Sequence, residues 1–517
     1  MRLTVGVTTV LPQWELLLGQ IGLPMERVVS DQAIPPDRYA VIIVTQGGGP
    51  SEKESLLHYV KQGGSLLTEA DAAHWLFGIR TIQGYVSYVA TAGDPIFDAV
   101  LPGFVDASVR IPHSASHLQS DSGRKLVRVL HEGRGSVIIL PSLLSSTVLD
   151  SKVRRRNFPS RGPLLPSERV SRRSKQTIRE TIQGSLEYLY MKRGLPFVSL
   201  WPFPDGARTL FNFRIDTDFA SRENVNNLYE LCDKREVPAT WFLEVHSSRK
   251  WLARFGEMEN QEMGVHCYRH RIFPDFVRNE RDINRAVRML NDLRIRPSGY
   301  AAPFGEWNVP LAKALEHHGF YYSSEFCLDY DNLPFNPYLG DRFTSVLQVP
   351  IHPIATSRLR NAHHSPEDMK IYFEDLIQTC IIHHLPVFVY DHPSNADLKT
   401  VNWLFSTIRR RQLSRVSLAE YARWWKKRSN LKWTADWDSG NLTVECPFPD
   451  SSICLYLRNS TTKWATVKIK DEIDLDTVAW KKDKKAKTVR TPMRNLASWN
   501  RKMTMNDILH FYWKLRY

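Results

Sequence analysis

Residues 209–219 constrain the fold most, because apolar and polar side chains alternate along them. Successive side chains of a strand point to opposite faces, so Asp216 and Asp218 share one face near the carboxyl end of the strand. Ser221 is suited to cap a following helix, with Asn224 three residues later. A strand that ends in carboxylates and leads into a helix is typical of α/β folds, where that end carries the chemistry. The aspartates could alternatively solvate the strand end or cap the helix.

Two histidines follow a second short apolar segment. Residues 262–266 predict a buried strand, and His266 and His270 would lie on one side of the chain if the turn after this strand were helical. An isolated pair at this spacing is more often accidental, but it gains weight after an Asp-x-Asp strand. Two carboxylates and two neutral imidazoles make the ligand set of a hydrolytic metal site. The pattern therefore indicates metal-assisted hydrolysis.

With these motifs the chain resembles the polysaccharide deacetylase superfamily, the NodB-homology domain or carbohydrate esterase family 4, over residues 204–427. The resemblance implies a distorted (β/α) barrel. It also implies Asp216 as the base and a divalent metal held by Asp218, His266 and His270. Zinc is the first expectation, with nickel, cobalt and manganese as alternatives. The most similar variant deformylates 4-deoxy-4-formamido-arabinose on undecaprenyl phosphate, and it shares Arg-Ile-Asp-x-Asp and Gly-Val-His-x-x-x-His.

A segment that begins at Gly299 resembles the third motif of the family, which forms a groove wall. Alanine stands here in place of the arginine that is usual in the family. A backbone N–H between Tyr300 and Phe304 is expected to stabilise the oxyanion of the reaction. Tyr300 and Trp307 could stack on a sugar ring, and core packing is the alternative for both.

Two further residues resemble later motifs. Glu325 stands where the family has aspartate, and it could orient His392 or a ligand histidine, or lie solvated in a loop. His392 ends an apolar strand and is implied as the acid that protonates the leaving amine, although a structural histidine in a turn is the alternative. Thr217 separates aspartates that the larger family has adjacent, so which of Asp216 and Asp218 binds the metal stays open.

Composition bounds the cellular context. A chain of 517 residues suggests two or three domains, and it contains no apolar run long enough to span a bilayer. The first residues lack the features of a signal peptide, so a cytoplasmic location is expected. The six cysteines show no Cys-x-x-Cys spacing, which favours a reduced state. A net charge of +14 suits anionic partners and permits peripheral membrane contact on the cytoplasmic face, although a solvated basic surface is the simpler alternative. No nucleic-acid partner is expected, because no binding motif is present.

Four segments are expected along the chain. Residues 1–150 have a βαβ pattern and resemble the flavodoxin-like fold of class I glutamine amidotransferases, but they lack the catalytic cysteine of those enzymes. Residues 151–203 are expected to form a basic linker and a helix. Residues 204–428 would form the deacetylase barrel. Residues 430–517 are rich in strand patterns, and a small β-sandwich is expected there.

The sequence thus favours a metal-dependent hydrolase that removes an N-acetyl or N-formyl group from an amino sugar. The substrate would be an N-acylated sugar, a polysaccharide, or a glycan linked to polyprenyl phosphate. One alternative is a hydrolase of a small non-sugar amide. Another is a non-catalytic carbohydrate-binding or scaffold protein of a glycan-assembly system.

Overall fold

The computed structural model describes residues 1–29, 33–91, 93–460, 462–482 and 493–496, together with the single residues 505, 508, 509 and 512. The chain divides into two compact units, and each collects segments that are far apart in the sequence. Unit 1 comprises Met1–Asp150, Arg173–Gly206 and Lys426–Lys485. Unit 2 comprises Ser151–Arg172, Ala207–Trp425 and Ala486–Tyr517. Within the described ranges, no helix has the length and apolar character needed to cross a membrane.

Unit 1 is built on a nine-stranded sheet with the order β2-β1-β3-β4-β9-β8-β7-β5-β6. Five neighbouring strands are parallel: β2 Met25–Arg27, β1 Val5–Val7, β3 Val41–Val44, β4 Ser65–Glu69 and β9 Gly135–Leu140. Four antiparallel strands extend this sheet: β8 Lys125–Glu132, β7 His117–Ser120, β5 Thr81–Ala90 and β6 Gly103–Pro112. The flavodoxin-like fold expected for residues 1–150 stays a prediction, because these antiparallel strands add to the parallel pattern on which that expectation rested.

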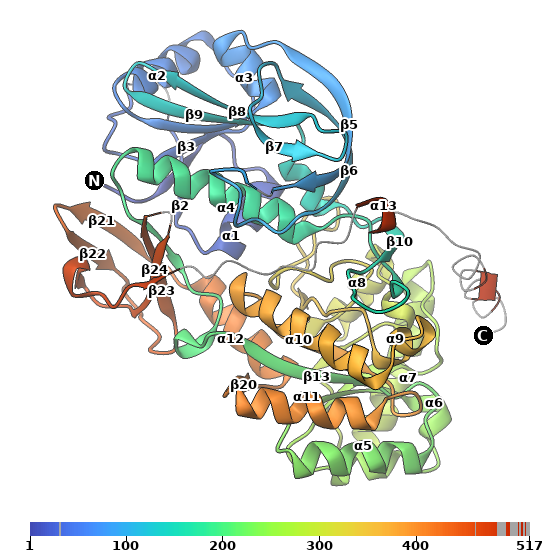
Figure 1. The fold of residues 1–517 in the computed structure, drawn as a ribbon. Helices are drawn as coiled ribbons and strands as arrows, with labels where there is room; N and C mark the ends of the chain where they lie inside the picture. Colours follow the sequence, from blue (N-terminus) through green and yellow to red (C-terminus); the bar gives the residue numbers. More distant parts are fainter. Residues whose placement is uncertain are drawn as a thin grey trace. The chain divides into compact units, whose positions relative to one another are not determined.

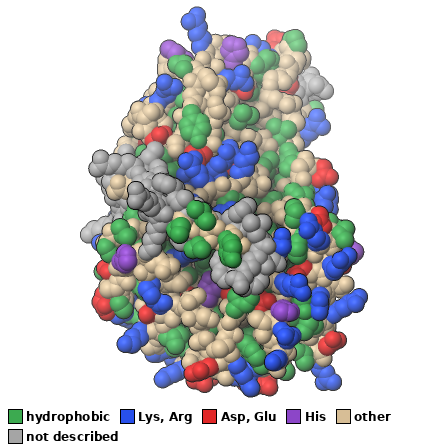
Figure 2. Space-filling view, turned by 90° about the vertical axis from the view of Figure 1, so that its right-hand side faces the viewer, with side chains coloured by type: hydrophobic (Ala, Val, Ile, Leu, Met, Phe, Trp, Pro, Cys, Tyr) green, Lys and Arg blue, Asp and Glu red, His purple; other side chains and the backbone are tan. Residues whose placement is uncertain are grey.

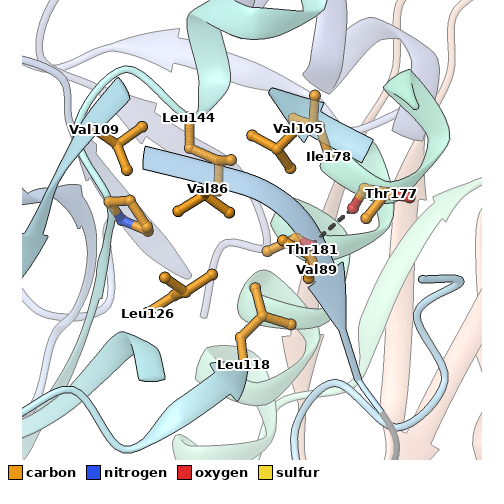
Figure 3. Close-up of a pocket in the computed structure, with 11 residues that line it drawn as sticks. Val86, Val89, Val105, Val109, Leu118, Leu126, Leu144, Thr177, Ile178 and Thr181 are labelled. Carbon is orange, nitrogen blue, oxygen red and sulfur yellow. Dashed lines mark hydrogen bonds between the residues drawn. The ribbon is translucent and has the colours of Figure 1, made fainter. Parts of the chain in front are cut away.

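Helices cover both faces of this sheet. Figure 1 shows α2 and α3 on one face, with α1 and α4 on the other. Their bounds are α1 Pro12–Ile21, α2 Pro50–Lys61, α3 Ala70–Phe77 and α4 Lys175–Lys192. Strands β1, β3 and β9 are buried along their whole length, as expected for strands covered on both faces, whereas the edge strand β2 is partly exposed. Next to α4, apolar side chains of the antiparallel strands line a small space (Figure 3), where Thr181 Oγ1 donates to the carbonyl of Thr177 at 2.7 Å.

Two small antiparallel sheets complete unit 1. One contains β12 Phe197–Leu200, β23 Cys454–Ser460, β24 Lys463–Lys468 and β26 Lys481–Lys482. The other contains β21 Thr434–Asp438, β22 Asn441–Glu445 and β25 Glu472–Asp474. The β-sandwich expected for residues 430–517 stays a prediction, because β12 joins one sheet from a distant segment and residues 483–492 lie outside the described ranges.

Unit 2 is an α/β domain with a sheet of eight parallel strands in the order β18-β17-β16-β15-β14-β13-β19, and β20 also pairs with β13. The strands are β13 Leu210–Asp216, β14 Thr240–Glu244, β15 Glu262–Cys267, β16 Gly299–Tyr300, β17 Tyr322–Ser323, β18 Leu347–Gln348, β19 Val387–Asp391 and β20 Ser414–Arg415. The helices are α5 Arg222–Lys234, α6 Val245–Ser248, α7 Phe276–Asp292, α8 Val309–His317, α9 Thr356–Asn361, α10 Pro366–Ile382, α11 Leu398–Arg410 and α12 Leu418–Asn430, which begins in unit 2. Strands and helices alternate along the chain, which confirms the distorted (β/α) barrel as the fold of this domain.

The segment that was expected to be a basic linker contains an antiparallel hairpin of β10 Val153–Asn157 and β11 Ser167–Ser171. Its second strand is fixed to the barrel, because Ser171 N–H donates to the carbonyl of Phe326 at 3.1 Å. Arg358 also forms an ion pair with Glu168 at 2.5 Å. This part of the segment is therefore a component of unit 2 rather than a free connection.

Candidate active site

The two aspartates of the Asp-x-Asp motif lie at the end of β13, where a hydrogen-bonded spacer holds them. Thr217 N–H donates to the carbonyl of Phe242 at 3.0 Å, and the N–H of Glu244 donates to Thr217 Oγ1 at 2.9 Å. Both partners belong to β14, so the residue between the aspartates continues the pairing of the sheet. Ser221 then caps α5, as predicted, by accepting from Asn224 N–H at 3.1 Å.

Asp218 and two histidines converge on one point. Asp218 Oδ1 lies 2.9 Å from His266 Nε2, and its Oδ2 lies 3.0 Å from His270 Nε2. One ligand atom from each residue falls within 4.8 Å of the others. Among the described residues, Asp218 Oδ1 and both Nε2 atoms are buried and make no hydrogen bond to a group outside this cluster. A buried oxygen and two buried nitrogens that converge in this way fit the donor set of a divalent metal.

The second ring nitrogen of His266 fixes how this histidine can bind. Its Nδ1–H donates to the carbonyl of Ala301 at 2.6 Å. In the neutral ring, a proton on Nδ1 leaves the lone pair of Nε2 free, and Nε2 faces Asp218. His270 reaches the site differently from the helical turn considered above, since residues 268–270 bend after β15.

The charges of the site favour an ionised Asp218. Burial alone would raise the pKa of Asp218, but His270, His266 and His392 hold it well below its ordinary value. Burial alone would lower the pKa of His266, but Asp218 raises it above the ordinary value, and Asp216 adds to this effect. The cluster thus favours an ionised carboxylate at Asp218, which is the form that binds a divalent cation.

Asp216 is held by an arginine that sequence analysis did not single out. Arg214 Nε lies 2.7 Å from Asp216 Oδ1, and its Nη2 lies 2.6 Å from Oδ2. The Arg214 side chain is 0% exposed and also donates to the carbonyl of Ser324. Its guanidinium lies over the rings of Phe242 and Tyr390, at 5.2 and 5.5 Å. The alternating sequence could have revealed this arginine, because Arg214 and Asp216 are two residues apart and therefore share one face of β13.

His392 faces the same cluster from the end of β19. Its Nε2 lies 3.4 Å from Asp218 Oδ2, and its ring packs edge-on against Tyr390 at 5.4 Å. The backbone N–H of His392 donates to Asp391 Oδ1 at 2.9 Å, which fixes the chain at this point. His392 is partly exposed, so this side of the cluster is open to a ligand.

Glu325 lies in a different environment from the one expected. It is fully buried rather than solvated, and its Oε1 accepts from Ala302 N–H at 3.2 Å. Burial raises the pKa of Glu325 to about 7, although Ser323 and Arg214 oppose this shift. The roles considered for it, orienting His392 or a ligand histidine, therefore stay predictions. The structure shows instead that Glu325 supports the loop after β16.

The loop after β16 mainly contributes packing, because backbone N–H groups in it already donate hydrogen bonds. Tyr300 is 1% exposed and packs edge-on against Phe320, so its ring cannot stack on a sugar. Ala301 N–H already donates to the carbonyl of Val265 at 3.0 Å. Ala302 N–H donates to Glu325, so two of the backbone N–H groups considered for the oxyanion already have acceptors. Phe304 contacts His270 edge-on at 4.7 Å, whereas Trp307 is half-buried outside this cluster.

Comparison with known proteins finds relatives of part of this domain. Residues 215–323 match the family model described as polysaccharide deacetylase. A peptidoglycan deacetylase from Helicobacter pylori is 28% identical over 133 residues, which are 25% of this chain and 45% of that protein, so the match spans less than half of the relative. Residues 215–323 are therefore similar to polysaccharide deacetylase domains, as the resemblance of the motifs led us to expect.

Solved structures resemble part of the chain. A Mycobacterium smegmatis protein described as a polysaccharide deacetylase has a TM-score of 0.37 at 19% identity, covering 44% of this chain and 93% of its own. A Pseudomonas aeruginosa PAO1 protein with the same description has a TM-score of 0.37 at 17% identity, covering 43% of this chain and 92% of its own.

Proposed function

We propose that unit 2 is a metal-dependent deacetylase that removes an N-acyl group from an amino sugar of a glycan. The observation that carries this proposal is the convergence of Asp218 Oδ1 with the Nε2 atoms of His266 and His270, which among the described residues make no hydrogen bond outside the cluster. Similarity to polysaccharide deacetylases supports deacetylation as the reaction. The buried pair of Asp216 and Arg214 and the exposed edge of His392 supply groups for proton transfer beside the cluster.

The site residues divide into binding and proton-transfer roles. A divalent cation held by Asp218, His266 and His270 would polarise the acyl carbonyl and acidify a water. Asp216 is the proposed base, because Arg214 fixes both of its oxygens while each keeps a further lone pair for a proton. His392 Nε2 is the proposed donor of a proton to the leaving amine. Zinc is the first expectation for a site with two imidazoles and one carboxylate, and nickel, cobalt or manganese are alternatives.

Elemental analysis beside a deacetylation assay tests the proposal. Wild-type protein should contain one equivalent of a divalent metal and release acetate from N-acetylglucosamine oligomers. Asp216→Asn should keep the metal and lose turnover, whereas His266→Ala should lose both. His363→Asn is the matched control, because His363 is an exposed histidine outside the site. Metal binding without turnover of any N-acyl sugar would favour the non-catalytic binding protein instead.

The acyl group and carrier of the substrate form a finer proposal. The motif around Arg214 resembles the variant that deformylates a polyprenyl-linked amino sugar, which favours N-formyl sugars as a second substrate class. Figure 2 shows Lys and Arg side chains scattered over the visible face, with Asp and Glu among them, and the net charge is +14. Such a surface suits an anionic carrier or membrane contact on the cytoplasmic face. Parallel assays with N-acetyl and N-formyl sugars, free and phosphate-linked, decide between these substrates.

A further inference from the structure

An exposed aromatic ring lies at the mouth of the metal cluster. Phe219 directly follows Asp218, and 53% of its surface is exposed. Its ring lies 5.3 Å from the ring of His270, so it borders one of the candidate ligands. Burying apolar surface is favourable, so the exposed part of the Phe219 ring offers a ligand at this site a surface to pack against.

The backbone couples this ring rigidly to the candidate metal ligand. Ala220 N–H donates to the carbonyl of Thr217 at 2.9 Å, which closes a tight turn with Asp218 and Phe219 at its centre. Phe219 has a φ of 48°, a left-handed conformation that bulky residues rarely adopt. Such conformations persist where the surrounding structure imposes them, often at binding sites. The turn thus presents a carboxylate and an apolar ring together.

A second phenylalanine repeats this arrangement on His270. Phe304 has a φ of 58° and contacts the His270 ring edge-on at 4.7 Å. The candidate ligand His270 therefore lies beside two aromatic side chains, both from left-handed positions. Of these rings, Phe219 is the exposed one, whereas Phe304 is half-buried.

We propose that Phe219 is the platform on which the pyranose ring of the substrate stacks, with its N-acyl group directed at Asp218, His266 and His270. This inference rests on the proposed function and adds the residue that selects a sugar over a small amide. A pyranose presents a face of C–H groups, which packs against an aromatic ring as other apolar groups do. Tyr300, the aromatic residue considered for this role, is buried.

Kinetics with two substrates test the platform. Tetra-N-acetylchitotetraose, called chitotetraose below, offers N-acetylated sugar rings, whereas p-nitrophenyl acetate offers an acyl group without a sugar. Phe219→Ala should raise the KM for chitotetraose about ten-fold, which corresponds to ~1.4 kcal/mol. Its metal content and its rate with p-nitrophenyl acetate should stay unchanged. Phe219→Tyr should restore the KM. Phe276→Ala, which removes another partly exposed ring of unit 2 (38% exposed), should leave every value unchanged.

The outcomes separate this inference from the function on which it rests. An unchanged KM in Phe219→Ala, with chitotetraose still deacetylated, overturns the platform and leaves the function intact. Loss of metal from Phe219→Ala makes the residue structural and also overturns the platform. If wild-type protein cleaves p-nitrophenyl acetate but no N-acyl sugar, the glycan function fails and the platform fails with it. Equilibrium binding of chitotetraose to Asp216→Asn, with and without Phe219→Ala, gives the same comparison without turnover, and weaker binding of the double variant supports the platform.

Discussion

Replacing Arg214 with methionine tests the buried ion pair directly. The change keeps an unbranched apolar side chain but leaves the carboxylate of Asp216, itself 3% exposed, without its two guanidinium hydrogen bonds. Removing one partner of a buried ion pair costs about 3–5 kcal/mol, because the remaining charge stays desolvated. We therefore expect Arg214→Met to lower the free energy of unfolding of unit 2 by about that amount. Turnover should fall as well, since the proposed base loses its orientation.

A double-mutant cycle separates the pair from other effects of the substitution. Asp216→Asn leaves the Arg214 guanidinium buried without a counter-charge, so it should also destabilise unit 2. The variant with both changes should recover much of the loss, with an interaction energy within about 0.5–3 kcal/mol. Urea titration read by hydrogen exchange of β13 peptides gives the stability of this strand alone, which suits a chain of two units. A single Arg214→Met variant within about 1 kcal/mol of wild type, or fully additive changes, would refute this reasoning.

Further predictions concern the surrounding residues. The pKa of Glu325 is raised from 4.5 to about 7, so the folded state keeps a proton that the unfolded state has lost between these values. The free energy of unfolding should therefore fall by about 1.4 kcal/mol per pH unit across this window, and Glu325→Gln should remove that slope in urea titrations at pH 5 and pH 8; equal slopes would contradict it. Thr217→Val leaves Glu244 N–H unsatisfied and should cost about 1–3 kcal/mol, with weaker metal retention in elemental analysis, whereas Thr217→Ser should behave as wild type. Ser221→Ala should lower stability by about 1 kcal/mol in thermal unfolding, and Ser221→Asp should not. A chelator should lower the Tm of wild type but leave His266→Ala unchanged; an equal shift in both would place the bound metal elsewhere.

Local sequence patterns were sufficient to place several parts of the site. Alternation over residues 209–219 located β13 and put Asp216 and Asp218 at its end, and Ser221 marked the start of α5. These features depend on neighbours within a few residues, which a sequence pattern records directly. The convergence of Asp218 with His266 followed from parallel strands whose carboxyl ends meet at one edge.

Other features depend on contacts between distant segments. The Arg-rich composition of residues 151–172 favoured a linker, yet Arg161 forms a two-pronged ion pair with Asp375 at 2.8 and 2.9 Å, and Glu168 pairs with Arg358. In each ion pair the two residues lie far apart in the sequence, so the composition of residues 151–172 alone does not reveal the pairing. The exposure of the Phe219 ring likewise depends on a positive φ, which the residue type does not predict because bulky residues rarely adopt it.

The discontinuous assembly of unit 1 has consequences for how the chain can be cut and made. Strand β12 lies before the barrel, and its partner β23 comes after it, so residues 207–425 form an insertion within unit 1. Deleting residues 1–150 would not remove an independent domain, because α4 and the two small sheets belong to the same compact unit as the nine-stranded sheet that would be lost. During synthesis from the amino terminus, unit 1 cannot complete its strand pairing until the whole barrel has left the ribosome.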